Sequence, residues 1–68
     1  MLHTYVWQVS LQVTSPERPA LRTQREYRVL ALSNARDTAI ATAKECADRD
    51  ELTVIDVVGV CRGYKVPS

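Results

Sequence analysis

The sequence predicts an α+β fold in which two strands, one helix and a third strand follow one another in a single domain, residues 1–68. Three patterns predict it. Apolar and polar residues alternate over residues 3–13, as in a half-buried strand. Apolar residues recur every three or four positions over residues 34–48, as on one face of a helix. A valine-rich run over residues 52–62 is typical of another strand.

The first strand is predicted over about residues 3–13. Its odd positions carry large apolar side chains, Trp7 among them, and are expected to face the core. Its even positions are polar apart from Val6. Two prolines, Pro16 and Pro19, are expected to end the strand, because proline lacks the amide donor that a strand ladder needs.

A second strand is predicted over about residues 21–32, where Tyr27 and Val29 alternate with a second set of side chains that includes Arg28 and Leu30. Only a short proline-containing segment separates the two strands. They are therefore expected to pair as an antiparallel hairpin.

The helix is predicted over about residues 34–48, with Ser33 or Asn34 as its N-cap. Its apolar stripe consists mostly of small side chains: Ala35, Ala39, Ile40, Ala43, Cys46 and Ala47. Small side chains let a helix lie close to a sheet, so the sheet must supply the bulk of the core. The side chains expected to do so are Tyr5, Trp7, Tyr27, Val29 and Ile55.

The third strand is predicted over about residues 52–62, and its facing is inferred from Asp56, which is expected to point outward. That phase places Thr53, Ile55 and Val57 inward and Val54, Val58 and Val60 outward. Gly59 could mark a bulge that changes the phase.

A helix between the second and third strands predicts a crossover, and right-handed crossovers predominate. The expected result is a three-stranded antiparallel sheet of order 2-1-3 (ββαβ), with the helix on one face and the other face open. At about 1.5 Å per residue the helix is shorter than the hairpin. Three apolar hairpin residues are therefore expected to project beyond it: Leu11, Val13 and Leu21.

The composition is that of an ordinary globular domain, with 46% apolar and 25% charged residues. The formal net charge of +1 gives no overall acidic or basic bias toward a partner. His3 is the only histidine, and no spacing joins it to a nucleophile. We therefore predict no catalytic residue, no cofactor and no enzymatic activity.

Two cysteines, Cys46 and Cys61, lie far apart in the chain. With His3 they supply fewer ligands than the four of a structural zinc site, so no metal site is predicted. Free, buried thiols are expected; a disulfide is the alternative if the helix and the last strand bring the two together. The chain has neither a signal-peptide pattern nor an apolar run of about 20 residues. A cytoplasmic location without membrane contact is therefore expected.

Arginines on the predicted hairpin are the most distinctive charged feature: Arg18, Arg22, Arg25 and Arg28. Arg22 and Arg28 share the open face with Gln8 and Gln12, and Arg62 is expected to join them from the third strand. Guanidinium groups there could bind carboxylates or phosphates, hence a protein or a nucleic acid. The alternative is a solvated edge strand that its charges protect from unwanted pairing. Base stacking is not expected, because the strand aromatics fall on the buried side.

A second candidate surface is apolar. Leu30 and the outward valines of the third strand are expected to form a homodimer or partner interface: Leu30, Val54, Val58 and Val60. The alternative is a different strand register, in which some of these side chains belong to the core.

The order of elements, and the run Tyr27-Arg28-Val29-Leu30-Ala31-Leu32-Ser33-Asn34-Ala35 that enters an alanine-rich helix, resemble small phage or mobile-element proteins. Some type I anti-CRISPR proteins share this strand–strand–helix–strand plan. The resemblance implies a non-enzymatic inhibitor that covers a nucleic-acid-binding surface of a host protein complex, and it carries over no functional residue. The predicted function is a small protein-interaction module of this kind, and the alternative is a nucleic-acid-binding protein.

Overall fold

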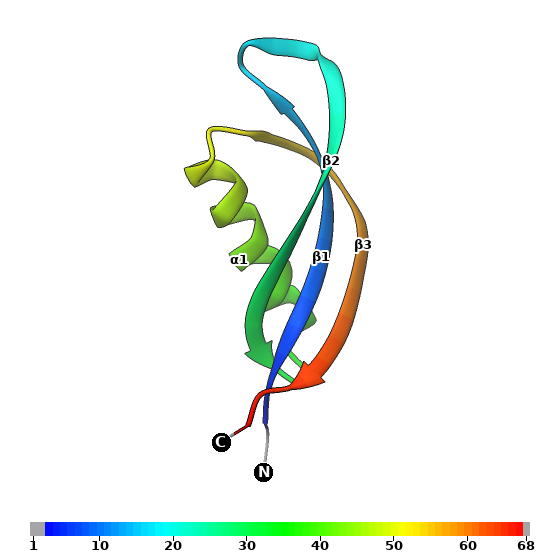
Figure 1. Ribbon diagram of the computed structural model, residues 1–68, viewed down its shortest axis with the longest axis vertical. Helices are drawn as coiled ribbons and strands as arrows, with labels where there is room; N and C mark the ends of the chain where they lie inside the picture. Colours follow the sequence, from blue (N-terminus) through cyan, green and yellow to red (C-terminus); the bar gives the residue numbers. More distant parts are fainter. Residues whose placement is uncertain (1–2, 68) are drawn as a thin grey trace.

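Two long strands joined by a tight turn dominate the structure, a computed structural model that describes residues 3–67 (Figure 1). In chain order the elements are β1 (Thr4–Ser15), β2 (Arg18–Leu32), α1 (Arg36–Arg49) and β3 (Thr53–Lys65). The sheet is antiparallel with the order β2-β1-β3, and α1 packs on one side of it. The predicted α+β, ββαβ fold and strand order are confirmed.

The hairpin is longer than the sequence pattern indicated. Only Pro16 and Glu17 separate the two strands, and Pro19 lies within β2. Proline is tolerated there because β2 is an edge strand, where a missing amide donor need not break a ladder bond. The register between the strands shifts in the same region, between Val13 and Ser15 of β1.

The core lies between β1 and α1, as predicted. Trp7 is 6% exposed, and its indole nitrogen donates a hydrogen bond to the Leu32 carbonyl at 3.2 Å. Fully buried alanines of α1 face the sheet and let the helix approach it closely: Ala39, Ala43 and Ala47. The β residues buried against them are Trp7, Val9, Leu11, Val13, Val29 and Ala31.

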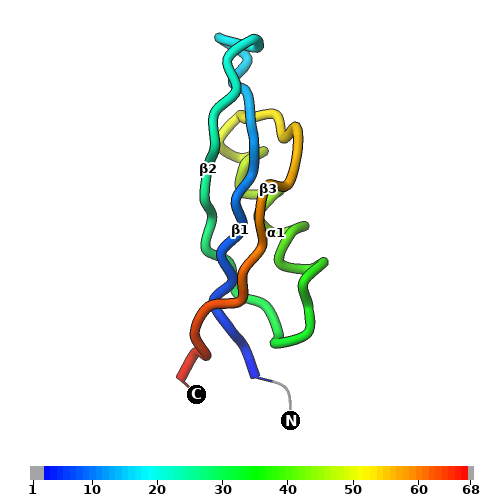
Figure 2. Tube along the Cα trace, turned by 90° about the vertical axis from the view of Figure 1, so that its right-hand side faces the viewer, coloured from blue at the N-terminus to red at the C-terminus, as the bar shows by residue number. Residues whose placement is uncertain are grey.

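The hairpin extends past the end of α1 and makes the molecule elongated, 44 × 19 × 16 Å (Figures 1 and 2). Residues 16–26 are all exposed. The expectation that Leu11 and Val13 project with it was wrong, because both are fully buried. Val54 pairs with Val13, and Leu52 also packs on the core, so the start of β3 covers this part of the hairpin. Leu21 is exposed, as expected.

The predicted facing of the third strand was wrong at four positions. Val54 and Val60 pack on the core, whereas Thr53 and Ile55 are exposed. The reason is that the β1–β3 register shifts three times, and each extra residue in β3 changes which side chains face inward. The side chains that pack on the core therefore recur every third residue: Val54, Val57 and Val60.

The two ends of α1 differ in how they are capped. Ala35 is the N-cap and makes no side-chain cap bond, so the predicted Ser33 or Asn34 cap was wrong. At the other end Glu51 adopts φ 62°, and Leu52 N–H donates to the Ala47 carbonyl at 2.9 Å. This pattern is a Schellman motif, which satisfies carbonyls at the helix end and directs the chain back into β3.

Candidate functional site

No element of residues 3–67 covers the face of the sheet opposite α1 (Figure 1). Alternation along the strands places the even-numbered residues of β1 and their β2 partners on this open face. The paired residues are Val6 with Leu30, Gln8 with Arg28, Ser10 with Glu26 and Gln12 with Gln24. The four β1 residues are half-buried and the four β2 residues are exposed.

One end of the open face is apolar. Leu30 is 61% exposed opposite Val6, and Leu32, the next residue on that side of β2, is 42% exposed. Tyr64, which is 69% exposed, precedes Lys65, whose partner Tyr5 faces the helix side. The register shifts between Tyr5 and Trp7, so Gly63 and Tyr64 together lie opposite Val6 in the sheet. We call these four residues the apolar end: Val6, Leu30, Leu32 and Tyr64.

The middle of the open face is polar. Gln8 lies between Arg28 of β2 and Cys61 of β3, and Gln12 lies between Gln24 and Asp56. The face therefore offers amide donors and acceptors beside a guanidinium group that can pair with a carboxylate. Arg28, Gln8 and Gln12 were predicted to share this face, and the structure brings them together.

The other hairpin arginines lie outside the polar middle, although Arg22, two residues before Gln24, stays on the same side of β2 as Gln24. Arg18 and Arg22 are exposed on the distal hairpin, beyond the polar middle. Arg25 pairs with Leu11 and so faces the helix side. None of these three guanidinium groups, nor that of Arg28, makes a hydrogen bond within the part of the chain that the structure describes.

Arg62 does not join the open face, which corrects the prediction. It pairs with Trp7 on the helix side of the sheet, because the bulges of β3 shift its phase. Its guanidinium lies 4.8 Å from the centre of the Tyr5 ring and donates to the Ser33 carbonyl at 3.3 Å. Arg62 therefore holds the chain entering α1 against the sheet.

Of the four residues predicted to form an apolar interface, two lie in or against the core and two on the surface. Val54 and Val60 pack on the core, so they cannot form a dimer patch. Leu30 and Val58 are exposed, at 61% and 54%. Leu30 belongs to the apolar end, and Val58 is the extra residue of a β3 bulge.

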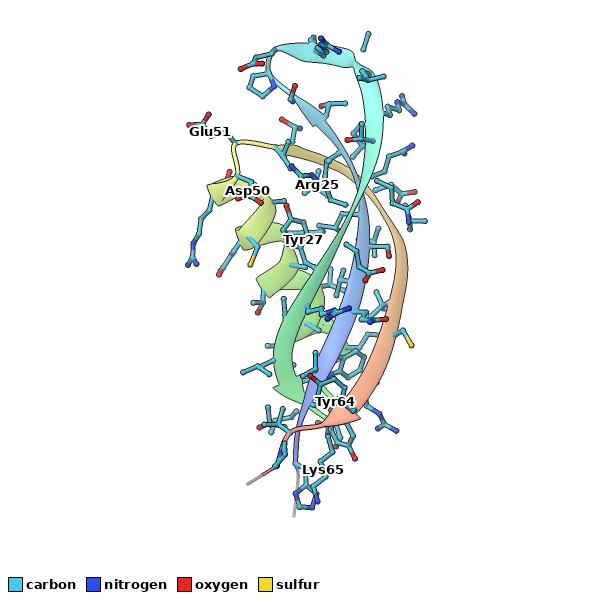
Figure 3. All side chains as sticks on the ribbon, viewed as in Figure 1. Arg25, Tyr27, Asp50, Glu51, Tyr64 and Lys65 are labelled. Carbon is cyan, nitrogen blue, oxygen red and sulfur yellow. The ribbon has the colours of Figure 1, made fainter. Side chains whose placement is uncertain are left out.

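A hydrogen bond between Tyr27 and Asp50 links β2 to the end of α1 (Figure 3). The phenol donates to Asp50 Oδ2 at 2.9 Å. Desolvation raises the pKa of Tyr27, and the bond to Asp50 and its negative charge raise it further, while the charge of Arg25 lowers it. The neutral phenol is therefore the form that the folded state favours.

We expect Tyr27→Phe to cost about 0.5–1.5 kcal/mol at neutral pH, because it removes this hydrogen bond. A pKa that is higher in the folded than in the unfolded chain contributes stability below about pH 10. That contribution disappears as the pH rises through the folded-state pKa. Urea unfolding from about pH 8 to about pH 12 should show the gap between the two proteins closing. A constant gap would contradict the assignment.

Other chemical features of the described residues are few. A shallow hollow of about 260 Å³ lies between α1 and β3, lined by Lys44, Val54, Ile55, Asp56 and Val57. Within residues 3–67, no three His, Cys, Asp or Glu side chains gather as a metal site. Both cysteines are free, as expected, but Cys61 is exposed and Cys46 only partly buried. No helix in that range is long and apolar enough to cross a membrane.

Sequence reasoning missed the apolar end as a unit. Its signals were Val6, the one apolar residue of the polar set, and the even-numbered Leu30 and Leu32. Tyr64 could not be placed, because β3 was predicted to end before it. Comparison with protein-family models finds no match, and comparisons with curated proteins and with solved structures find none either.

Proposed function

We propose that this chain is a small, non-enzymatic protein-binding module whose open sheet face docks on a partner protein. The observation that carries the proposal is the apolar end, three of whose side chains are between 42% and 69% exposed. Clustered exposed apolar side chains next to polar groups are typical of a protein interface.

The polar middle adds the specificity expected of such an interface. Arg28 and Gln8 lie directly beside the apolar end and are held on paired strands rather than on loops. The paired strands fix the backbone of these residues before binding, so docking has to order only their side chains. The partner that fits is a protein with an apolar patch next to a carboxylate that Arg28 can bind.

The resemblance to small phage proteins extends this proposal to inhibition. A module of 68 residues that covers a partner's working surface would block it without any chemistry of its own. We also propose a cytoplasmic location, which the two free cysteines support, because thiols persist in reducing compartments.

Nucleic-acid binding is the second candidate, and the distal hairpin is the observation that favours it. Arg18 and Arg22 are exposed on a two-stranded ribbon that projects past α1 (Figure 2). The major groove of DNA accepts such a ribbon, and arginines bind its phosphates.

A capture experiment with two matched leucine variants tests these proposals. Leu30→Ser alters the apolar end, and Leu21→Ser alters a leucine of similar exposure on the distal hairpin. In nuclease-treated host lysate, we expect the wild type and Leu21→Ser to retain one and the same protein. With that protein purified, Leu30→Ser should bind about tenfold more weakly or worse.

Three outcomes decide between the candidates once circular dichroism shows that both variants are folded. Weakening by Leu30→Ser alone supports docking through the open face. Equal weakening by both variants, or by neither, contradicts it. In a parallel lysate without nuclease, retention of nucleic acid alone, released steeply by rising salt and weakened by Arg18→Glu, favours the second candidate.

A further inference from the structure

The outer edge of β2 carries unpaired backbone groups at alternate residues. Ser33 N–H donates to the His3 carbonyl at 3.0 Å, in the register of the β1–β2 ladder. The odd-numbered residues of β2 therefore bond to β1, and the even-numbered ones direct their N–H and C=O groups away from it. These even-numbered residues are Gln24, Glu26, Arg28 and Leu30, whereas the Leu32 carbonyl already accepts from Trp7 Nε1–H and Ala35 N–H.

This edge is regular enough to accept another strand. The β1–β2 register runs without a shift from Thr23 to Leu32. The opposite edge, β3, contains three register shifts, and bulges of this kind hinder pairing. β2 is therefore the edge at which backbone pairing can continue the sheet.

Two copies of the β2 edge have complementary charges when they lie antiparallel. An antiparallel second copy of β2, related by a two-fold axis beside Tyr27, places Glu26 opposite Arg28 of the other chain. The two-fold axis also places Arg28 of the first chain opposite Glu26 of the second, so two opposite-charge pairs flank the axis. Opposite charges at facing positions stabilise a strand pair, and like charges destabilise it.

We propose that two copies of this chain associate edge to edge through β2 in this register, forming one continuous six-stranded sheet. The neighbouring even-numbered registers are less favourable, because one places Glu26 opposite Glu26 and the other places Arg28 opposite Arg28. In the proposed register Leu30 lies opposite Gln24, so no like charges meet along the edge.

The arrangement is compatible with the rest of the fold. A two-fold axis perpendicular to the sheet keeps both helices on one face, so the open face becomes continuous across the two copies. The antiparallel pairing also sets residues 22–26 of each hairpin beside residues 28–32 of the other β2, where they gain a neighbouring strand. Self-association uses the backbone edge of β2 and partner docking uses the open face, and Arg28 lies where the two surfaces meet.

Charge exchange across the edge tests the proposal. By sedimentation equilibrium the wild type should reach twice the 7.6 kDa of one chain as its concentration rises. Glu26→Arg and Arg28→Glu each create two like-charge pairs and should weaken self-association at least tenfold. The double variant E26R/R28E restores opposite charges and should recover it. The matched control, Arg36→Glu, alters an exposed arginine of α1 and should change nothing.

Amide hydrogen exchange of the wild type gives a second readout that needs no variant. Exchange at the even-numbered amides from Gln24 to Leu30 should slow as the concentration rises. A wild type that stays monomeric at millimolar concentration, or a double variant that is folded but not recovered, overturns the proposal. A dimer whose even-numbered amides exchange at the monomer's rate overturns it too. Since these measurements contain no partner protein, failure of the proposed function leaves their outcome unchanged.

Discussion

Replacing Trp7 with alanine is expected to lower the free energy of unfolding by about 3–5 kcal/mol. The indole is 6% exposed at the centre of the sheet, where it packs between β1 and the alanine face of α1. Truncation leaves a cavity that the small alanines of the helix cannot fill, and it removes the hydrogen bond to the Leu32 carbonyl.

The size of this effect matters because the domain is small. At roughly 0.05–0.15 kcal/mol per residue, a chain of this length has a total stability of about 3–10 kcal/mol. Trp7→Ala should therefore lose roughly a third of this stability or more. Urea unfolding followed by circular dichroism measures the change.

Two further variants separate the contributions of the tryptophan. Trp7→Phe keeps most of the apolar volume but loses the hydrogen bond, so it should cost clearly less than the alanine variant. Leu30→Ala, at a side chain that is 61% exposed, should change stability by less than about 0.5 kcal/mol. A Trp7→Ala variant with the same urea midpoint as the wild type would contradict the burial of the indole between the sheet and α1.

The parts of the fold that the sequence predicted well are those in which one pattern continues without interruption. β1 alternates cleanly, so its inner face could be identified from Trp7 onward. The alanines of α1 recur at helical spacing, and the three most central ones are fully buried. Side-chain period alone is sufficient when no residue is inserted.

β3 shows why the rest could not be predicted. A bulge inserts one residue without any change in composition, so a run of valines looks the same before and after it. Asp56 was interpreted as marking the outer face, which it does, but the shifts on either side of it reversed Val54 and Val60. Gly59 had indicated a bulge without revealing how many there are.

The candidate site was predicted in part for the same reason. Gln8, Gln12 and Arg28 lie on strands paired in a regular register, and they share a face as expected. Arg62 and Tyr64 lie on the bulged strand, and both were misplaced or missed. The sequence therefore predicted the open face on the regular β1–β2 pair but not on the bulged strand β3.

Gly63→Ala is expected to destabilise the domain by about 1–3 kcal/mol, the usual cost of forcing an extra methyl group into a packed position. A Cβ atom at Gly63 would lie 2.6 Å from the Val6 carbonyl oxygen. Because that neighbour is backbone in the central strand, it cannot rotate away as a side chain could, and β3 must move instead. The change is measured as the shift in the urea unfolding midpoint.

Gly59 provides a matched control in the same strand. A Cβ atom at Gly59 meets nothing within 4 Å, and neither glycine has a positive φ. Gly59→Ala should therefore be neutral or stabilise by up to about 1 kcal/mol, since alanine reduces the entropy of the unfolded chain. Equal effects at both glycines would show that strand propensity, rather than the close contact, sets the cost.

Gly63 also connects stability to the proposed function. The close approach of its backbone to Val6 holds the end of β3 against β1, and Tyr64 is the next residue. A displaced β3 end would carry Tyr64 away from Val6 and divide the apolar end. Gly63→Ala should therefore weaken partner binding even under conditions in which the variant is fully folded, whereas Gly59→Ala should leave binding intact.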